Sequence, residues 1–217
     1  MKATQGAKYV DPTFLRNWNE AQKYEISRSA YHFFTTFDPP QSQASNIATT
    51  LKKVNFQPGY NGLVIDVEGD SCLVEVDTMS RNVLSLITLL EEMYNFPVFI
   101  YTRANYWNAC INTTWNNVWL KRPLWVAYYS DTAKQPVLPK PWSSSGTWVL
   151  WQYSQTCRMP GIKGNVDLSY LNPNLTDMSQ FGKNVAVKST SSNLFQPANI
   201  YLLINLLNSM YKTLIIM

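Results

Sequence analysis

Short apolar runs and helical apolar stripes alternate along the first 170 residues of the chain. Apolar runs bounded by Gly, Pro, Asp or Asn predict strands, and apolar positions spaced by three and four residues predict helices. We expect residues 1–6 to hold the end of a strand and the loop that follows it. Further strands are expected near 29–34, 63–68, 98–102, 124–129, 148–154 and 165–170. We expect helices over 12–24, with Asp11 as N-cap, over 44–51 and 80–94, and one or two short helices within 105–120.

The order of these elements predicts an α/β fold. Strand and helix alternate in the first half, which is typical of a parallel sheet with crossover helices, whereas the later strands follow one another with little helix between them. An irregular (β/α) barrel of the TIM type, with helix-poor last strands, fits both halves. In such barrels the C-terminal ends of the strands carry the chemistry.

Two carboxylates close the apolar run of Leu63, Val64 and Ile65. Asp66 and Glu68 lie two residues apart, so on a strand they point to the same side with their Cα atoms about 6.5 Å apart. Two ionised carboxylates at this distance repel each other, so the pKa of one should rise above the pKa of the other. This supplies the acid and the carboxylate that glycoside hydrolysis needs near neutral pH. An ordinary surface Asp and Glu at the mouth of a loop is the alternative for an isolated pair.

Neighbouring strand ends add polar and aromatic side chains to this pair. Tyr101, Tyr128 and Gln152 all fall at or near predicted strand ends. The chain also holds 8 Trp and 13 Tyr, which fill a core first but also offer flat faces with polar edges suited to stacking on sugars. This convergence favours a catalytic role for Asp66 and Glu68.

Composition excludes several other classes of function. The balance of 18 Lys and Arg against 14 Asp and Glu gives a net charge of +4, too small and too scattered to indicate a nucleic-acid partner. Cys72, Cys110 and Cys157 are widely spaced, so they predict neither a disulfide framework nor a metal site. His32, the single histidine, makes zinc binding still less expected, and we assign it to hydrogen-bonded packing. We expect no metal and no cofactor.

Seven segments, in order and at similar spacing, resemble the family 25 glycoside hydrolases, the Chalaropsis-type lysozymes. They are Lys2–Gly6, Ala30–Phe33, Asp66–Glu68, Ile100–Thr102, Leu124–Ala127, Trp151–Ser154 and Val166–Leu168. The resemblance implies an N-acetylmuramidase that hydrolyses the β-1,4 bond between N-acetylmuramic acid and N-acetylglucosamine in bacterial peptidoglycan, without a cofactor. An inactive glycan-binding remnant and a chitinase-like barrel are the alternatives.

The resemblance also implies roles for single residues. Glu68 would be the general acid, Asp66 would stabilise positive charge or orient the N-acetyl group of the substrate, and Asp167 would be a further acidic group of the site. The expected substrate-binding residues are Tyr31, Tyr101, Trp125, Tyr128 and Gln152.

Both ends of the chain depart from this pattern. The family begins with an earlier strand that bears an Asp, so we expect the chain to be N-terminally truncated, without that strand and its carboxylate. We expect residues 1–172 to form the barrel domain and 173–217 to form a polar linker followed by an apolar tail.

The tail is nearly long enough to span a bilayer, but three Asn residues and Lys212 interrupt it. We therefore expect an amphipathic helix or a stretch without a selected role, rather than a membrane span. No signal-peptide pattern opens the chain, although the resemblance implies a secreted or wall-directed protein. The sequence does not indicate an oligomeric state.

Overall fold

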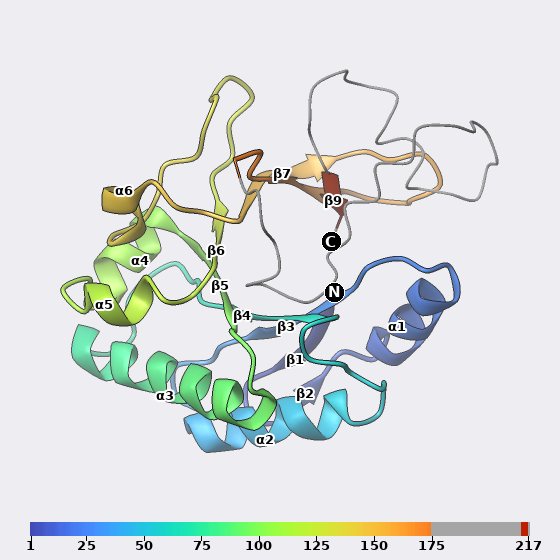
Figure 1. Cartoon of the computed structure of the whole chain (residues 1–217), viewed down its shortest axis with the longest axis horizontal. Helices are drawn as coiled ribbons and strands as arrows, with labels where there is room; N and C mark the ends of the chain where they lie inside the picture. Colours follow the sequence, from blue (N-terminus) through green and yellow to red (C-terminus); the bar gives the residue numbers. More distant parts are fainter. Residues whose placement is uncertain (175–213, 217) are drawn as a thin grey trace.

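A curled, open sheet forms the centre of the molecule (Figure 1). The structure is a computed structural model that describes residues 1–174 and 214–216. The strands within that part lie in the order β2-β1-β3-β4-β5-β6-β7-β8-β9. Their bounds are β1 Lys2–Gln5, β2 Tyr9–Val10, β3 Ser29–Phe33, β4 Gly62–Asp66, β5 Phe99–Arg103, β6 Leu124–Ala127, β7 Leu150–Cys157, β8 Val166–Leu171 and β9 Leu214–Ile216.

Strand direction divides the sheet into a parallel middle and antiparallel ends. Strands β1 and β3 to β7 pair in parallel, while β2, β8 and β9 join antiparallel. Helices connect the parallel strands, because a parallel pair needs a crossover, whereas β7 and β8 follow each other directly. The predicted α/β barrel-like fold with helix-poor last strands is confirmed as a half-barrel, and the N-terminal truncation stays a prediction.

The helices cover the convex face of the sheet. Figure 1 shows α2 and α3 side by side along this face, with α4, α5 and α6 gathered beside β5 and β6. Their bounds are α1 Phe14–Lys23, α2 Pro40–Leu51, α3 Val76–Tyr94, α4 Ala104–Cys110, α5 Asn116–Trp119 and α6 Trp142–Ser145. Within the described residues, no helix combines the length and the apolar character needed to cross a bilayer.

Alternation along each strand sorts side chains between two cores. Leu63 and Ile65 of β4 face the helices and are buried in the larger cluster. Val64, between them, faces the concave side with Tyr101 and Trp125 of the next two strands. Because side chains on a strand alternate between faces, one strand supplies both the core under the helices and the wall of the concave side.

The start of α1 differs from the prediction. Thr13, not Asp11, occupies the N-cap position. The Asp11 carboxylate instead accepts hydrogen bonds from the backbone N–H of Thr13 at 2.8 Å and from its hydroxyl at 2.6 Å. Asp11 therefore closes the turn that precedes the helix, as Asp commonly does two residues before a backbone N–H.

His32 is confirmed as a packing residue. It is fully buried, and its Nε2 donates to Gln43 Oε1 at 3.0 Å because an amide oxygen only accepts. Its Nδ1 is 2.7 Å from Thr4 Oγ1. Burial lowers the pKa of His32 to about 4, so the ring is neutral and ties β3 to β1 and α2.

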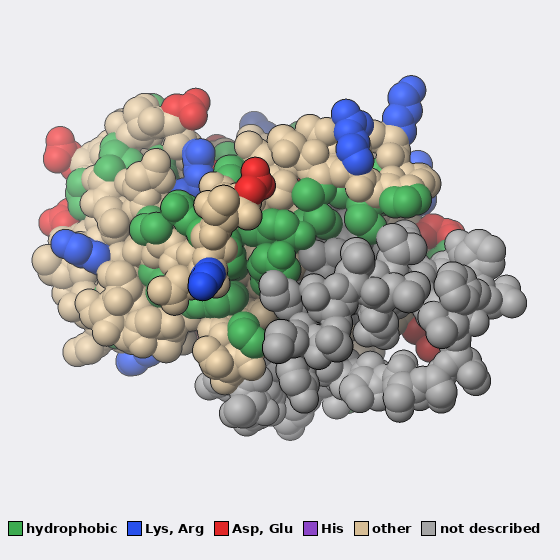
Figure 2. Space-filling model, turned by 90° about the horizontal axis from the view of Figure 1, so that it is seen from above, with side chains coloured by type: hydrophobic (Ala, Val, Ile, Leu, Met, Phe, Trp, Pro, Cys, Tyr) green, Lys and Arg blue, Asp and Glu red, His purple; other side chains and the backbone are tan. Residues whose placement is uncertain are grey.

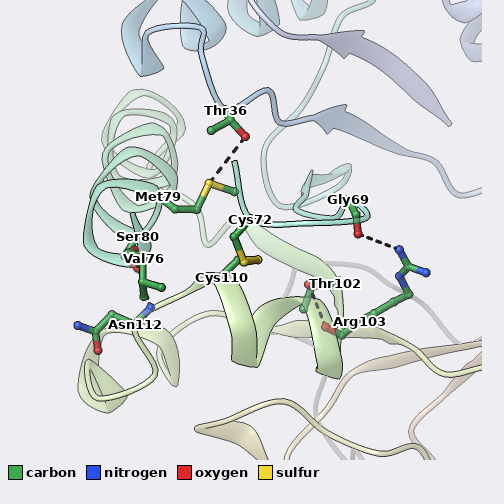
Figure 3. The surroundings of a disulfide bond; sticks show 10 residues. All are labelled: Thr36, Gly69, Cys72, Val76, Met79, Ser80, Thr102, Arg103, Cys110 and Asn112. Atoms are coloured by element: carbon green, nitrogen blue, oxygen red, sulfur yellow. Dashed lines mark hydrogen bonds between the residues drawn. A yellow bond between two sulfur atoms is a disulfide. The ribbon is translucent and has the colours of Figure 1, made fainter. Parts of the chain in front are cut away.

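The interpretation of the cysteines was wrong for two of them. Cys72 and Cys110 form a disulfide with their Cα atoms 5.2 Å apart, while Cys157 forms none (Figure 3). Cys72 lies in the loop after β4 and Cys110 ends α4, the helix that follows β5. Because β4 and β5 are neighbours, the sheet brings together two residues that are 38 positions apart in sequence.

Most of the predicted linker and tail lies outside the described residues. Leu214–Ile216 forms strand β9, antiparallel to β8, where an amphipathic helix was one expectation. The predicted domain boundary at residue 172 follows the end of β8 at Leu171. The division into a barrel domain and a tail stays a prediction.

Candidate active site

A cavity of about 120 Å³ opens on the concave side of the sheet. It is lined from successive strands or the residues just after them, which is where barrel enzymes place their reacting groups. The lining residues are Tyr31, Val64, Asp66, Glu68, Tyr101, Trp125, Tyr129, Gln152, Gln155 and Asp167. Seven of the eight side chains predicted for the site therefore lie together.

Backbone hydrogen bonds on both sides hold the two central carboxylates in place. The N–H of Phe34 donates to the carbonyl of Asp66 at 2.9 Å, and that of Val67 donates to the carbonyl of Tyr101 at 2.9 Å. The hydroxyl of Thr102 donates to the carbonyl of Val67 at 2.7 Å. The segment between Asp66 and Glu68 is thus fixed to β3 and β5, so both side chains project toward the cavity from a rigid backbone.

Asp66 is the most deeply buried acid of the site. Its side chain is 7% exposed, and its Oδ1 has no hydrogen-bond partner among the described residues. Burial and the nearby Glu68 carboxylate raise the pKa of Asp66 well above its usual range, more than Lys2 and Arg103 lower it. Asp66 therefore holds a proton at a higher pH than an exposed carboxyl group does, as the spacing of the two acids predicts.

Glu68 is half-buried, and charges of both signs surround it. Burial raises its pKa, the guanidinium of Arg103 lowers it, and the carboxylates of Asp167 and Asp70 raise it. The Nε of Arg103 lies 3.6 Å from Oε2 of Glu68. Sequence reasoning missed Arg103. Its position follows from the register between β4 and β5: Asp66 is opposite Tyr101, so Glu68, two residues further on, lies beside Arg103.

Asp167 lies on β8, and the curl of the sheet brings it to the cavity that Asp66 of β4 also lines. Burial raises its pKa, and a side-chain hydrogen bond with Gln152 lowers it. The hydroxyl of Tyr101 donates to Oε1 of Gln152. One amide therefore links the tyrosine of β5 to the carboxylate of β8 across the cavity.

Aromatic rings form the walls of the cavity. The rings of Tyr101 and Trp125 meet edge to face with centroids 5.9 Å apart, and Nε1 of Trp125 donates to Ser169 Oγ at 3.2 Å. Tyr31 of β3 packs against the same cluster, and burial together with the Asp66 and Asp167 carboxylates raises its pKa. Rings held in this way offer apolar faces and polar edges to a sugar.

Tyr128 is the predicted residue that the structure does not bring into the cavity. Its ring packs against the larger core under the helices, and its neighbour Tyr129 lines the cavity instead. The reason is alternation: Trp125 faces the concave side, so Ala127 and Tyr129 do too, and Tyr128 faces away. Counting from Trp125 could have found Tyr129, whereas no sequence signal indicated Gln155.

The described part of the chain contains no group of three or more His, Cys, Asp or Glu side chains placed to hold a metal ion. On the face of Figure 2, hydrophobic side chains gather along the centre, and Lys and Arg side chains are scattered around it, some of them close together at the upper right.

A half-barrel with two acids at a strand end and aromatic walls is an arrangement compatible with glycoside hydrolysis. The family model described as "Glycosyl hydrolases family 25" matches residues 1–162, and the chain belongs to this family.

Relatives and solved structures agree with this membership. The chain is 31% identical over 192 residues to Lysozyme M1 of Streptomyces globisporus, covering 86% of this chain and 63% of that protein. It thus spans less than two thirds of that relative. A bacterial lysozyme from Streptomyces coelicolor superposes with a TM-score of 0.68 at 30% identity, covering 79% of each chain. A family 25 lysozyme from Aspergillus fumigatus shares the fold, with a TM-score of 0.67 at 24% identity, covering 84% of this chain and 86% of that one.

Proposed function

We propose that the protein is a lysozyme, an N-acetylmuramidase that hydrolyses the β-1,4 bond between N-acetylmuramic acid and N-acetylglucosamine in bacterial peptidoglycan. The observation that carries the proposal is the pair Asp66 and Glu68, which line one aromatic-walled cavity and whose pKa values are both raised by burial. The lysozyme names of the relatives from Streptomyces globisporus and Streptomyces coelicolor support it.

Glu68 acts as the general acid. It is half-buried, which leaves its carboxyl group within reach of a substrate while burial keeps its pKa raised. A carboxylic acid that stays protonated toward neutral pH can donate its proton to the glycosidic oxygen as the bond to the anomeric carbon breaks. The leaving sugar then departs as an alcohol rather than as an alkoxide.

In its ionised form, Asp66 stabilises the positive charge that develops on the sugar ring. Its Oδ1 has no partner in the described chain, so it is free to accept a hydrogen bond from the substrate. The acetamido N–H beside the anomeric carbon is a suitable donor, and a hydrogen bond there orients the acetamido group. This role holds both for a route through two carboxylates and for a route in which the acetamido oxygen of the substrate attacks.

The remaining residues bind and orient the glycan. Tyr31, Tyr101 and Trp125 offer ring faces and edges to sugar rings. Gln152 and Asp167, already linked by a hydrogen bond, offer further polar groups for sugar hydroxyls and amides. Tyr129 replaces Tyr128 in this set, because it is the residue of the two that lines the cavity.

The first test measures release of reducing sugar from purified peptidoglycan by the chain and by its Glu68→Gln variant. Glutamine keeps the shape but has no acidic proton, so we expect the rate to fall by about 100-fold or more. Glu92→Gln, on the exposed side of α3, is the matched acid-to-amide control and should keep full activity. Circular dichroism and peptidoglycan pull-down check that all three proteins fold and bind.

Two outcomes would contradict the proposal. Full activity in Glu68→Gln would remove Glu68 as the acid. Binding without hydrolysis by the unaltered, folded chain would favour the glycan-binding remnant. Soluble chitin oligomers, assayed in parallel, identify a chitinase-like activity if they are cleaved faster than peptidoglycan.

A further inference from the structure

A second cavity, of about 340 Å³, lies beside the first. Its walls come from the loop after β4 and from the end of β5 with helix α4, joined by the Cys72–Cys110 disulfide (Figure 3). Its volume falls in the range of about 300–1,000 Å³ that is usual for ligand pockets. It is lined by Gly69, Asp70, Ser71, Cys72, Arg103, Asn105, Tyr106, Ala109 and Cys110.

Glu68 and Arg103 form the partition between the two cavities. Glu68 lines the first cavity, and the second begins at the next residue, Gly69. Arg103 lines the second cavity, places Nε 3.6 Å from the Glu68 carboxylate and donates from Nη2 to the carbonyl of Gly69 at 3.3 Å. The Glu68 carboxylate also raises the pKa of Tyr106 in the second cavity, after burial, the larger cause. A ligand in the second cavity would therefore lie directly beside the proposed general acid.

The second cavity offers charge and hydrogen-bonding groups rather than ring faces. Asp70 and Asn105 are exposed, and neither side chain makes a hydrogen bond or ion pair with another described residue. Tyr106 is the only ring in the lining and is 8% exposed, with its edge against Gly69. Sugar rings bind best on exposed aromatic faces. The first cavity has such a ring in Tyr129, which is 37% exposed, and the lining of the second cavity has none. The lining fits a peptide that carries a carboxylate and an amine better than it fits another sugar.

We propose that the second cavity binds the peptide stem that the lactyl group of N-acetylmuramic acid carries, a proposal that rests on the proposed function. Arg103 pairs with a carboxylate of the stem, and Asp70 pairs with the side-chain amine of its diamino acid. Asn105 hydrogen-bonds to a peptide group. The lactyl group belongs to the sugar whose anomeric bond is cleaved. The peptide attached to the lactyl group therefore extends from that sugar close to Glu68.

The first test measures binding alone, so it does not depend on turnover. Titration calorimetry compares N-acetylmuramic acid with the same sugar carrying a tripeptide that ends in a diamino acid. We expect the unaltered chain to bind the muramyl tripeptide at least about fivefold more tightly than the sugar. Asp70→Asn should remove most of this difference, and Glu92→Gln should keep it. Equal affinity of the unaltered chain for both ligands, or an undiminished preference in Asp70→Asn, would overturn the proposal.

The second test measures hydrolysis of intact peptidoglycan and of glycan strands whose stems an amidase has removed. The rates are compared on the acidic side of the alkaline limb, where Glu68 stays protonated, because the Asp70 carboxylate also raises the pKa of Glu68. There, Asp70→Asn should lower kcat/KM on the intact polymer by about fivefold and change it less than twofold on the stripped strands. An equal loss on both substrates would assign Asp70 to the sugar site and overturn the proposal. If the unaltered chain hydrolyses neither substrate, the result counts against the proposed function. Calorimetry would still show whether the second cavity binds the peptide stem.

Discussion

At the scale of single residues, Arg103 adjusts the acid strength of Glu68. Its guanidinium is 3.6 Å from the Glu68 carboxylate and lowers the pKa of Glu68, opposing burial and the carboxylates of Asp167 and Asp70. Because the general acid works in its protonated form, activity falls as the pH rises through the pKa of Glu68. With Arg103 present, activity is therefore lost at a lower pH than it would be if burial alone set the pKa of Glu68.

Replacing Arg103 tests this balance. Arg103→Gln removes the positive charge, so the pKa of Glu68 rises and the alkaline limb of the kcat/KM profile moves to higher pH. The measurement is the rate on stem-free glycan strands across the pH range, which keeps the second cavity empty. Arg81→Gln, at an exposed position on α3, is the control and should leave the limb in place. An alkaline limb that stays fixed or moves to lower pH in Arg103→Gln would contradict the assignment of Glu68 as the acid.

The position of a side chain could be predicted where it follows from local spacing. The side-by-side acids Asp66 and Glu68 could be found because two residues on one strand share a face. Arg103 could not, because its effect on Glu68 depends on the register between β4 and β5. The prediction placed Tyr128 in the cavity, one position away from the residue that lines it. Local spacing would have been enough here, because alternation from Trp125 indicates Tyr129.

At the scale of elements, the loop after β4 and helix α4 form one unit. The Cys72–Cys110 disulfide joins them, and the Gly69 carbonyl in the same loop accepts a hydrogen bond from Arg103. A Cβ at Gly69 would lie 3.2 Å from the Tyr106 ring, so the loop packs closely against α4. Glu68 lies at the start of this loop, and the second cavity lies between the loop and α4. The unit therefore forms part of both proposed binding regions.

Removing the disulfide tests the unit. The double variant Cys72→Ser/Cys110→Ser frees a 38-residue loop, so we expect the free energy of unfolding to fall by about 2–4 kcal/mol. Urea unfolding measures this change, and an excess of dithiothreitol should reproduce it in the unaltered chain. Cys157→Ser, which breaks no disulfide, is the control. Equal stability of the double variant and the control would show that the bond does not hold the loop.

Element boundaries could be predicted where apolar periodicity marks them. Helix α3 starts at Val76 rather than residue 80, because Val76 and Met79 extend the apolar stripe of Val83 by one turn, which the prediction left out. The short strands β2 and β9 were not predicted, since two or three residues are too few to show a period. The disulfide escaped prediction because its partners meet only once β4 and β5 are paired.

At the scale of the whole molecule, a half-barrel gathers side chains from β3 to β8 around one cavity. The order of strands and helices could be predicted because each parallel pair requires a crossover and each buried strand leaves an apolar run. The curl of the sheet, which brings Asp167 of β8 across from Asp66 of β4, is a property of the assembled sheet. Sequence reasoning placed Asp167 in the site through the family resemblance and not through spacing.

The central claim, cleavage on the reducing side of N-acetylmuramic acid, can be tested directly on the products. Purified peptidoglycan is digested with the chain or with Glu68→Gln, reduced with borohydride and hydrolysed, and the amino sugar alcohols are quantified. We predict that muramitol appears with the unaltered chain and stays at background with the variant. Glucosaminitol in place of muramitol, or no alcohol above background from a folded chain that binds the polymer, would contradict the claim.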